Sequence, residues 1–318
     1  MSCLYLDRKN LGLKLEGQAI VLYENDTRKG SVPLHLLDRI VLRGNVRLDS
    51  RLLGALTERN IGLLALSGRN TEAIAMLAGR SHSDSARRLG QYCTSLNKDL
   101  RTPLARWLVL VKVRSQLRFL KQAMARRPDL RFPLSGAMQT LSGIISQLRE
   151  DQFAISMDSL RGYEGAAASA YFSGFVHLFA PALHFTGRYK RPPPDPVNAC
   201  LSLGYTLLHY DAVRACHIVG LDSTLGFYHD ISFGRESLAC DLMEPLRAQM
   251  DGWVWQLFRE RELRAEYFSN DNGRCLMNKT GRQRFYAFYE AHAAPARRLL
   301  RRYGHALCKR YLLTYEAR

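Results

Sequence analysis

The spacing of apolar residues changes after about residue 80 of the chain. In residues 11–16 leucine alternates with glycine, lysine and glutamate, which is the pattern of a strand with one buried face. Other short apolar runs that predict strands lie at residues 4–6, 19–23, 39–44, 61–66 and 73–77. We therefore predict a small β-rich N-terminal domain over residues 1–80, and we expect it to serve in assembly.

A polar, serine-rich segment follows, and we predict a linker over residues 81–95. Beyond it, the apolar residues between Leu104 and Met124 recur at the spacing of an amphipathic helix. Similar helical patterns continue through the rest of the sequence. We therefore predict a larger all-α domain over residues 96–318, so that the fold class is α+β with more than one domain.

The chain is strongly basic. It contains 46 Lys and Arg against 29 Asp and Glu, which gives a formal net charge of +17. Such an excess indicates a polyanionic partner, because basic side chains that neutralise phosphates release counterions. The alternative is a chain that is basic for solubility only. No acid lies between Arg101 and Arg127, so this helix presents either a solvated face or a surface for phosphates.

Cysteine content and apolar run lengths exclude several classes of protein. The seven cysteines are scattered and form no Cys-x-x-Cys pair, which disfavours a disulfide framework or a zinc site and fits a reducing cytosol. No apolar run approaches the roughly 18 residues of a membrane span. The first residues do not have the pattern of a secretory signal. We expect a cytoplasmic protein with no membrane partner.

Three side chains in unusual local sequences are candidate metal ligands: Glu164, His229 and Asp241. Two carboxylates and one imidazole suit Mg²⁺ or Mn²⁺ better than a metal that prefers thiolates. Glu244 follows Asp241 by three residues, so both project from one face of a helix, and Pro245 leaves that turn open. The alternatives to metal binding are that Glu164 is an ordinary surface residue and that His229 has only a structural role.

A basic loop precedes a predicted helix in the middle of the chain. Residues 188–191 carry two arginines and a lysine, and the prolines that follow fix an extended approach to the helix. A stiff, arginine-bearing loop at a helix N-terminus can bind phosphate. A rigid connector with incidental charge is the alternative.

Four motifs taken together resemble those of a known family. They are Gly-Tyr-Glu-Gly-x-Ala-Ala at 162–168, Arg-x-x-Arg-Pro-Pro-x-Asp-Pro-x-Asn-Ala at 188–199, Gly-Leu-Asp through the histidine at 220–229, and Gly-Arg-x-Ser-Leu-Ala-x-Asp-Leu-Met-Glu-Pro at 234–245. In this order they resemble the CRISPR-associated integrase, the endonuclease of the spacer-acquisition module. The resemblance covers nearly the whole chain.

The resemblance implies a divalent metal, Mg²⁺ or Mn²⁺, held by Glu164, His229 and Asp241, with Glu244 as a supporting acid. It implies that short foreign DNA fragments are inserted into a CRISPR repeat array by transesterification with a 3′ hydroxyl. We expect phosphates of double-stranded DNA to be contacted by a set of arginines: Arg161, Arg188, Arg191, Arg235 and Arg247.

The resemblance also implies an assembly. The family forms a homodimer through the N-terminal domain, and two dimers flank a dimer of a small ferredoxin-like CRISPR-associated adaptation protein, which gives a heterohexamer. Two other functions stay open at this point. One is a metal-dependent DNA-repair nuclease that acts on branched DNA, and the other is a catalytically silent DNA-binding scaffold.

Overall fold

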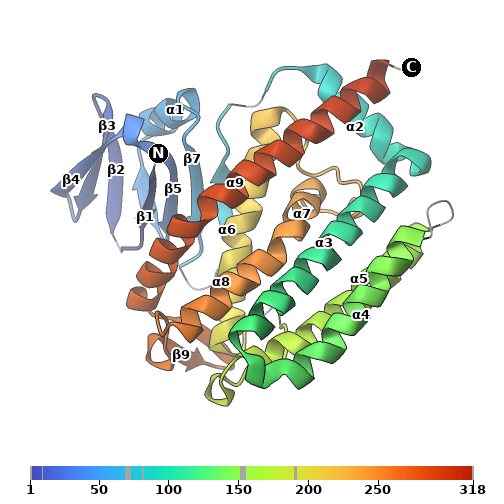
Figure 1. The fold of residues 1–318 in the computed structure, drawn as a ribbon. Coiled ribbons are helices and arrows are strands. Elements are labelled where there is room, and N and C mark those ends of the chain that lie inside the picture. Colours follow the sequence, from blue (N-terminus) through green and yellow to red (C-terminus); the bar gives the residue numbers. More distant parts are fainter. Residues whose placement is uncertain are drawn as a thin grey trace.

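A strand-rich N-terminal region is followed by a helical region, which confirms the predicted fold class (Figure 1). The computed structural model describes residues 2–8, 10–68, 73–80, 82–150, 155–189 and 192–316. Figure 1 shows the strands of the N-terminal region gathered at one side of the molecule, with helices α4 and α5 at the opposite side. The limits of the domains at residues 80 and 95 stay predictions.

The first sheet joins the two regions. Its strand order is β1 (Ser2–Leu6), β5 (Leu37–Arg43), β7 (Gly62–Leu66) and β8 (Ala73–Leu77). The first three strands run parallel and β8 is antiparallel to β7. Successive side chains of a strand point to opposite faces. Val41 and Leu64 belong to the core of the helical region, whereas Ile40, Leu42 and Leu63 belong to the smaller core of the N-terminal region.

The second sheet closes the smaller core from the other side. Its order is β4 (Thr27–Pro33), β3 (Ala19–Glu24), β2 (Leu11–Glu16) and β6 (Val46–Leu48), with β6 parallel to β2 and the other neighbours antiparallel. Helix α1 (Ser50–Glu58) supplies buried leucines to this core. The alternation in residues 11–16 is therefore explained, because Leu11 and Leu13 are buried while Lys14 is exposed.

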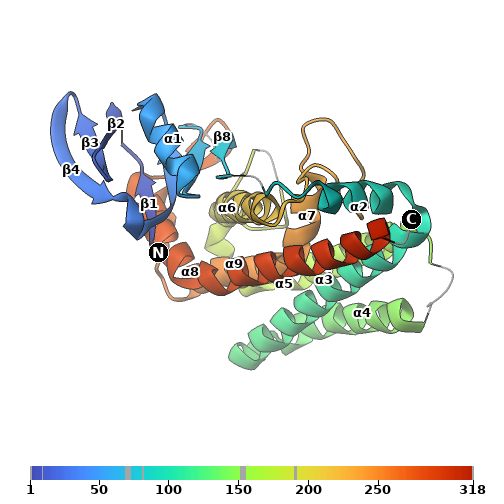
Figure 2. The same ribbon diagram turned by 90° about the horizontal axis from the view of Figure 1, so that it is seen from above.

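Eight helices of the described residues build the helical region, and Figure 2 shows them from above. They are α2 (Ser85–Leu96), α3 (Lys98–Arg126), α4 (Arg131–Glu150), α5 (Met157–Phe175), α6 (Pro196–Val219), α7 (Ser237–Met243), α8 (Arg247–Arg259) and α9 (Lys279–Glu316). Most residues of α6 are buried, because α7, α8 and α9 all pack on it. Helix α2 covers most of the segment 81–95 that was predicted as a linker and ends at Leu96. A hairpin that the sequence analysis did not predict, β9 (Phe268–Asp271) and β10 (Arg274–Met277), precedes α9.

A buried cluster of charges joins the first sheet to helices α6 and α9. The carboxylate of Asp211 pairs with Arg39 of β5, and its Oδ2 atom accepts hydrogen bonds from Arg297 Nε and from the Tyr289 hydroxyl, each at 2.9 Å. Burial alone would raise the pKa of Asp211, but the charges of the two arginines outweigh it and lower that pKa. The two regions are thus held together by ion pairs as well as by apolar packing.

Among the described residues, no helix is both long and apolar enough to span a membrane.

Candidate metal centre and basic pocket

Two glutamates from different parts of the helical region meet at one lysine. Glu164 lies in the middle of α5, and Glu244 begins the short 3₁₀ helix η5 (Glu244–Leu246) that links α7 to α8. The Nζ atom of Lys112, on α3, contacts Glu164 Oε1 and lies 2.5 Å from Glu244 Oε2. Lys112 therefore bridges the two carboxylates, and its own side chain is only 11% exposed.

Glu244 is buried and is nevertheless held in its ionised form. The Nε atom of Arg247, one turn further along, donates to Glu244 Oε1 at 2.6 Å. Burial raises the pKa of a carboxyl group, but the charges of Arg247 and Lys112 outweigh this effect and lower the pKa of Glu244 to about 2. Oε2 has no hydrogen-bond partner of acceptable geometry, although the ammonium group of Lys112 is close.

Asp241 and His229 form a second part of the same neighbourhood. Asp241 Oδ1 accepts hydrogen bonds from the His229 amide at 3.0 Å and from His229 Nδ1 at 2.7 Å. Oδ2 accepts from the amides of Phe227 at 2.7 Å and Tyr228 at 3.0 Å. An ionised carboxylate has about four acceptor positions. All four acceptor positions of Asp241 are used here. Because Nδ1 of His229 donates to Asp241, the other ring nitrogen, Nε2, is left to accept a hydrogen bond or to bind a metal.

The segment that precedes His229 must approach Asp241 closely for these hydrogen bonds to form. Gly226 makes this possible, because a Cβ atom at this position would lie 2.6 Å from Asp241 Oδ2 and 2.9 Å from the backbone carbon of Ser237. Asp241 itself is completely buried on α7. Pro245 then ends the α-helical hydrogen bonding and places Glu244 at the start of η5, where it turns toward α3.

The predicted ligands are therefore brought together, although not as a finished metal site. His229 lies close enough to Glu244 for the two side chains to interact electrostatically, and Glu164 and Glu244 share Lys112. Within the described ranges, no three His, Cys, Asp or Glu side chains are arranged to hold a metal ion. The contacts give the reason, because Lys112 lies between the glutamates and Asp241 is turned to the backbone amides. Carboxylate oxygens and an imidazole nitrogen are nevertheless the donor set that Mg²⁺ or Mn²⁺ accepts.

The five predicted phosphate contacts differ in their environments. Arg161 is partly exposed and is paired with two aspartates. Arg235 lies on the exposed loop before α7. Arg188 donates a hydrogen bond to the side-chain oxygen of Asn198 at the start of α6. Arg247 is paired with Glu244. Arg191 lies outside the described residues.

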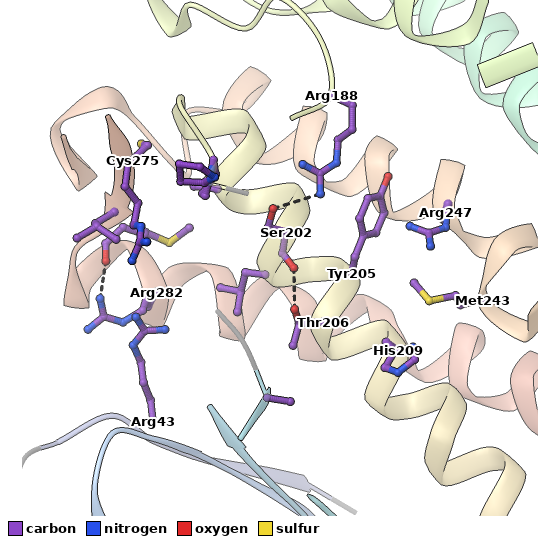
Figure 3. Close-up of a pocket in the computed structure, with 18 of the residues that line it drawn as sticks. Arg43, Arg188, Ser202, Tyr205, Thr206, His209, Met243, Arg247, Cys275 and Arg282 are labelled. Carbon is purple, nitrogen blue, oxygen red and sulfur yellow. Dashed lines mark hydrogen bonds between the residues drawn. The ribbon is translucent and has the colours of Figure 1, made fainter. Parts of the chain in front are cut away.

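A basic pocket of about 850 Å³ lies between the first sheet, α6 and the start of α9. Figure 3 shows Arg43 and Arg282 at one end of it and Arg188 and Arg247 at the other, with Ser202, Tyr205, Thr206 and His209 of α6 between them. Arg274 also lines this pocket, and Glu236 is its one acid among the described residues. Arg43 Nη1 and Arg188 Nε are buried without a hydrogen-bond partner. The pocket therefore favours an anionic ligand.

Arg247 joins the pocket to the metal centre, because it lines the former and pairs with Glu244 of the latter. Its guanidinium group also lies over the ring of Tyr205, 4.7 Å from the ring centre. Arg247 and Arg188 were predicted from the sequence as phosphate contacts, whereas Lys112 and Arg43 were not predicted as site residues. A signal for Lys112 was present, because it occupies the apolar face of α3 in register with Leu104 and Leu108.

Comparison with known proteins gives the family. The family model described as CRISPR associated protein Cas1 matches residues 4–291. A CRISPR-associated endonuclease Cas1 of Thermodesulfovibrio yellowstonii is 39% identical over 95% of this chain and 94% of its own length. Another, from Rhodospirillum rubrum, is 34% identical over 94% of this chain and 88% of its own length. The chain belongs to the Cas1 family of CRISPR-associated endonucleases, as the four motifs predicted.

Solved structures show the same fold. A Cas1 protein from Thermotoga maritima matches with a TM-score of 0.85 at 24% identity, over 98% of this chain and 97% of that one. A casposase bound to an integration product matches with a TM-score of 0.82 at 19% identity, over 97% of this chain and 91% of that one. A chain of a Cas6-RT-Cas1–Cas2 complex matches with a TM-score of 0.81 at 20% identity, over 98% of this chain and 35% of its own.

Proposed function

We propose that this endonuclease works as an integrase, which inserts short foreign DNA fragments into a CRISPR repeat array by transesterification with a 3′ hydroxyl. Membership of the Cas1 family supports this proposal, as does the fold shared with a casposase that was solved with an integration product. The observation that carries it in this molecule is the convergence of Glu164, Glu244 and His229 beside a pocket rich in arginine.

We assign the metal ligands as Glu164, Glu244 and Nε2 of His229. Asp241 then holds the imidazole ring in the tautomer that keeps Nε2 free, because its carboxylate accepts from Nδ1. This proposal exchanges the roles that the sequence analysis gave to Asp241 and Glu244. Its basis is that the backbone amides and His229 already use the acceptor positions of Asp241.

When bound, Mg²⁺ or Mn²⁺ would supply a Lewis acid for the target phosphate and would lower the pKa of the attacking hydroxyl. The protein supplies the rest. Arg247 keeps Glu244 ionised and faces the pocket, where its charge and that of Arg188 can neutralise phosphate oxygens. The chemistry needs no covalent enzyme intermediate, so it requires no activated serine or cysteine.

The partners we propose are double-stranded DNA, a second copy of this chain and a small ferredoxin-like CRISPR-associated adaptation protein, in a heterohexamer. The net charge of +17 supports DNA binding. Similar chains occur in Cas6-RT-Cas1–Cas2 complexes, which supports the small partner. We assign dimerisation to a domain of residues 1–80 and catalysis to a domain of residues 96–318, whereas most of the segment predicted as a linker, 81–95, forms helix α2 of the helical region. Seven free cysteines agree with a cytoplasmic location.

Strand joining tests the proposed function. Labelled duplex fragments with free 3′ hydroxyls are incubated with a repeat-bearing plasmid, the small partner and Mn²⁺, and joined products are resolved on a denaturing gel. We expect joined strands at the repeat. Hydrolysis without joining would favour the DNA-repair nuclease, and the absence of any cleavage would favour the silent scaffold.

Two amide substitutions test the assignment of roles. Glu244→Gln removes a proposed direct ligand, so we expect Mn²⁺ binding, measured by calorimetry, to be lost. Asp241→Asn keeps a similar shape but cannot accept from all four donors, so we expect weakened rather than abolished Mn²⁺ binding. The opposite ranking of the two variants would restore Asp241 as the direct ligand.

A further inference from the structure

We propose that Lys112 is a built-in counter-cation of the metal centre, which holds Glu164 and Glu244 together before metal binds and must withdraw when metal arrives. Lys112 would thereby weaken the affinity for the metal and set the metal concentration at which the site fills. This inference rests on the proposed metal centre and adds to it a residue that the four sequence motifs do not contain.

The position of Lys112 is unusual for a lysine. It lies on the buried face of α3, among residues that are otherwise apolar or uncharged: Leu104, Leu108, Val109, Val113, Gln116 and Leu120. Lysine is almost never buried unless it is paired. Both of its partners are carboxylates of the proposed ligands, and they come from two separate elements, α5 and η5. A solvated surface role for this lysine is therefore excluded.

The contacts place the ammonium group where the carboxylates would share a cation. Nζ touches Oε1 of Glu164 and lies 2.5 Å from Oε2 of Glu244. The other oxygen of Glu244 is held by Arg247. Oε2 makes no hydrogen bond of acceptable geometry with Lys112, so the contact is mainly one of charge with charge. A divalent ion needs these same oxygens at about 2.0–2.2 Å.

The charges in the cluster explain why Lys112 must move. Glu164 and Glu244 contribute two negative charges, and Lys112 and Arg247 contribute two positive charges, so the four groups balance without metal. A divalent ion added to this balanced set would face an ammonium group at contact distance. The flexible four-carbon stem of lysine allows the group to withdraw, whereas the planar guanidinium of Arg247 keeps its own fixed pairing.

Replacing the ammonium group with an uncharged one should therefore have two opposite effects. Without metal, the buried carboxylate of Glu244 and the partly buried carboxylate of Glu164 lose the cation that offsets their repulsion, and the protein should unfold at a lower temperature. With metal, no ammonium group competes for the oxygens that Lys112 contacts, and the site should bind the metal more tightly. A lysine with only a structural role would give the first effect without the second.

The test uses the full chain with Lys112→Met, which keeps an unbranched stem, and Lys121→Met as matched control at an exposed position of the same helix. Mn²⁺ dissociation constants are measured by electron paramagnetic resonance of the free ion, and melting temperatures are measured in EDTA and in Mn²⁺. For Lys112→Met we expect Mn²⁺ to bind at least about tenfold more tightly. We also expect a lower melting temperature in EDTA and a larger stabilisation by Mn²⁺, with the control behaving as the unmodified protein.

The results separate this inference from the proposed metal centre. If the unmodified protein binds Mn²⁺ and Lys112→Met binds it equally or less tightly, the counter-cation role is wrong and the metal centre stands. If neither protein binds Mn²⁺, both proposals are wrong. Lys112→Gln, which donates hydrogen bonds without a charge, is measured in parallel. Variants that fold only with Mn²⁺ would support the inference, and variants that fold under neither condition would overturn it.

Discussion

Asp251 offers a test of how burial and hydrogen bonding balance inside the helical region. This α8 side chain is buried, and it accepts hydrogen bonds from the hydroxyls of Tyr171, at 2.9 Å, and Tyr205. Burial raises the pKa of Asp251 to about 6, and the hydrogen bonds and the charges of Arg247 and Arg188 only partly offset it. We expect Asp251→Asn to change how the free energy of unfolding depends on pH.

The direction of this pH dependence follows from the pKa of Asp251 in the unfolded chain and in the folded protein. The unfolded chain loses the Asp251 proton near the ordinary aspartate pKa of 3.8, whereas burial raises the pKa in the folded protein to about 6. Between these values the folded state binds more protons, so this group makes stability fall as pH rises. The shift of about two pH units corresponds to about 3 kcal/mol. The asparagine variant lacks this penalty and should gain up to that amount relative to the unmodified protein between about pH 4 and pH 7.

Urea unfolding over this pH range measures the difference. Asp271→Asn, at an exposed position, serves as control for the general effect of losing one carboxylate. The difference between Asp251→Asn and the unmodified protein should grow with pH and become constant above about pH 7. A difference that does not depend on pH would refute the reasoning, because it would mean that Asp251 is already ionised in the folded protein at low pH.

Three further outcomes can be measured. Asp211→Ala should lower the free energy of unfolding by about 3–5 kcal/mol in urea, because Arg39 and Arg297 lose the buried carboxylate that they share, and a loss below about 1 kcal/mol would contradict this. Gly226→Ala should reduce Mn²⁺-dependent cleavage and Mn²⁺ affinity, since its methyl group would displace Asp241, whereas Gly54→Ala, where nothing lies within 4 Å, should leave both unchanged. DNA affinity should fall linearly on a logarithmic plot against salt concentration, and a flat plot would exclude phosphate contacts as its source.

The sequence predicted the architecture where one physical rule dominates. Alternation at residues 11–16 predicted a strand with one buried face, as β2 has. Residues 40–42 are continuously apolar because β5 lies between two cores, which a sequence pattern does not reveal by itself. The hairpin before α9 was missed although Asn272 and Gly273 both have positive φ, the backbone conformation that Asn-Gly favours in tight hairpin turns.

The sequence motifs predicted which residues to consider for the candidate site, and both their membership in a metal site and their roles in it stay predictions. The motifs gave Glu164, His229, Asp241 and Glu244, and the structure brings them into one neighbourhood. Whether a carboxylate faces a metal or a set of backbone amides depends on how the loop at Gly226 folds over α7, which the spacing of residues does not encode. In α3, Lys112 is the one basic residue that is buried, and in the sequence only its helical register with Leu104 and Leu108 distinguishes it from the others.

The shared sheet between the two cores has a practical consequence for dissecting the molecule. A fragment cut at residue 80 would leave Val41 and Leu64 without the helices that cover them, and would remove the buried carboxylate of Asp211 from Arg39. The remaining helices would in turn expose Asp211 and the ring of Tyr286, which stacks on Tyr5 at 4.2 Å. Neither piece should be soluble by itself, and the intact chain should melt in one cooperative transition.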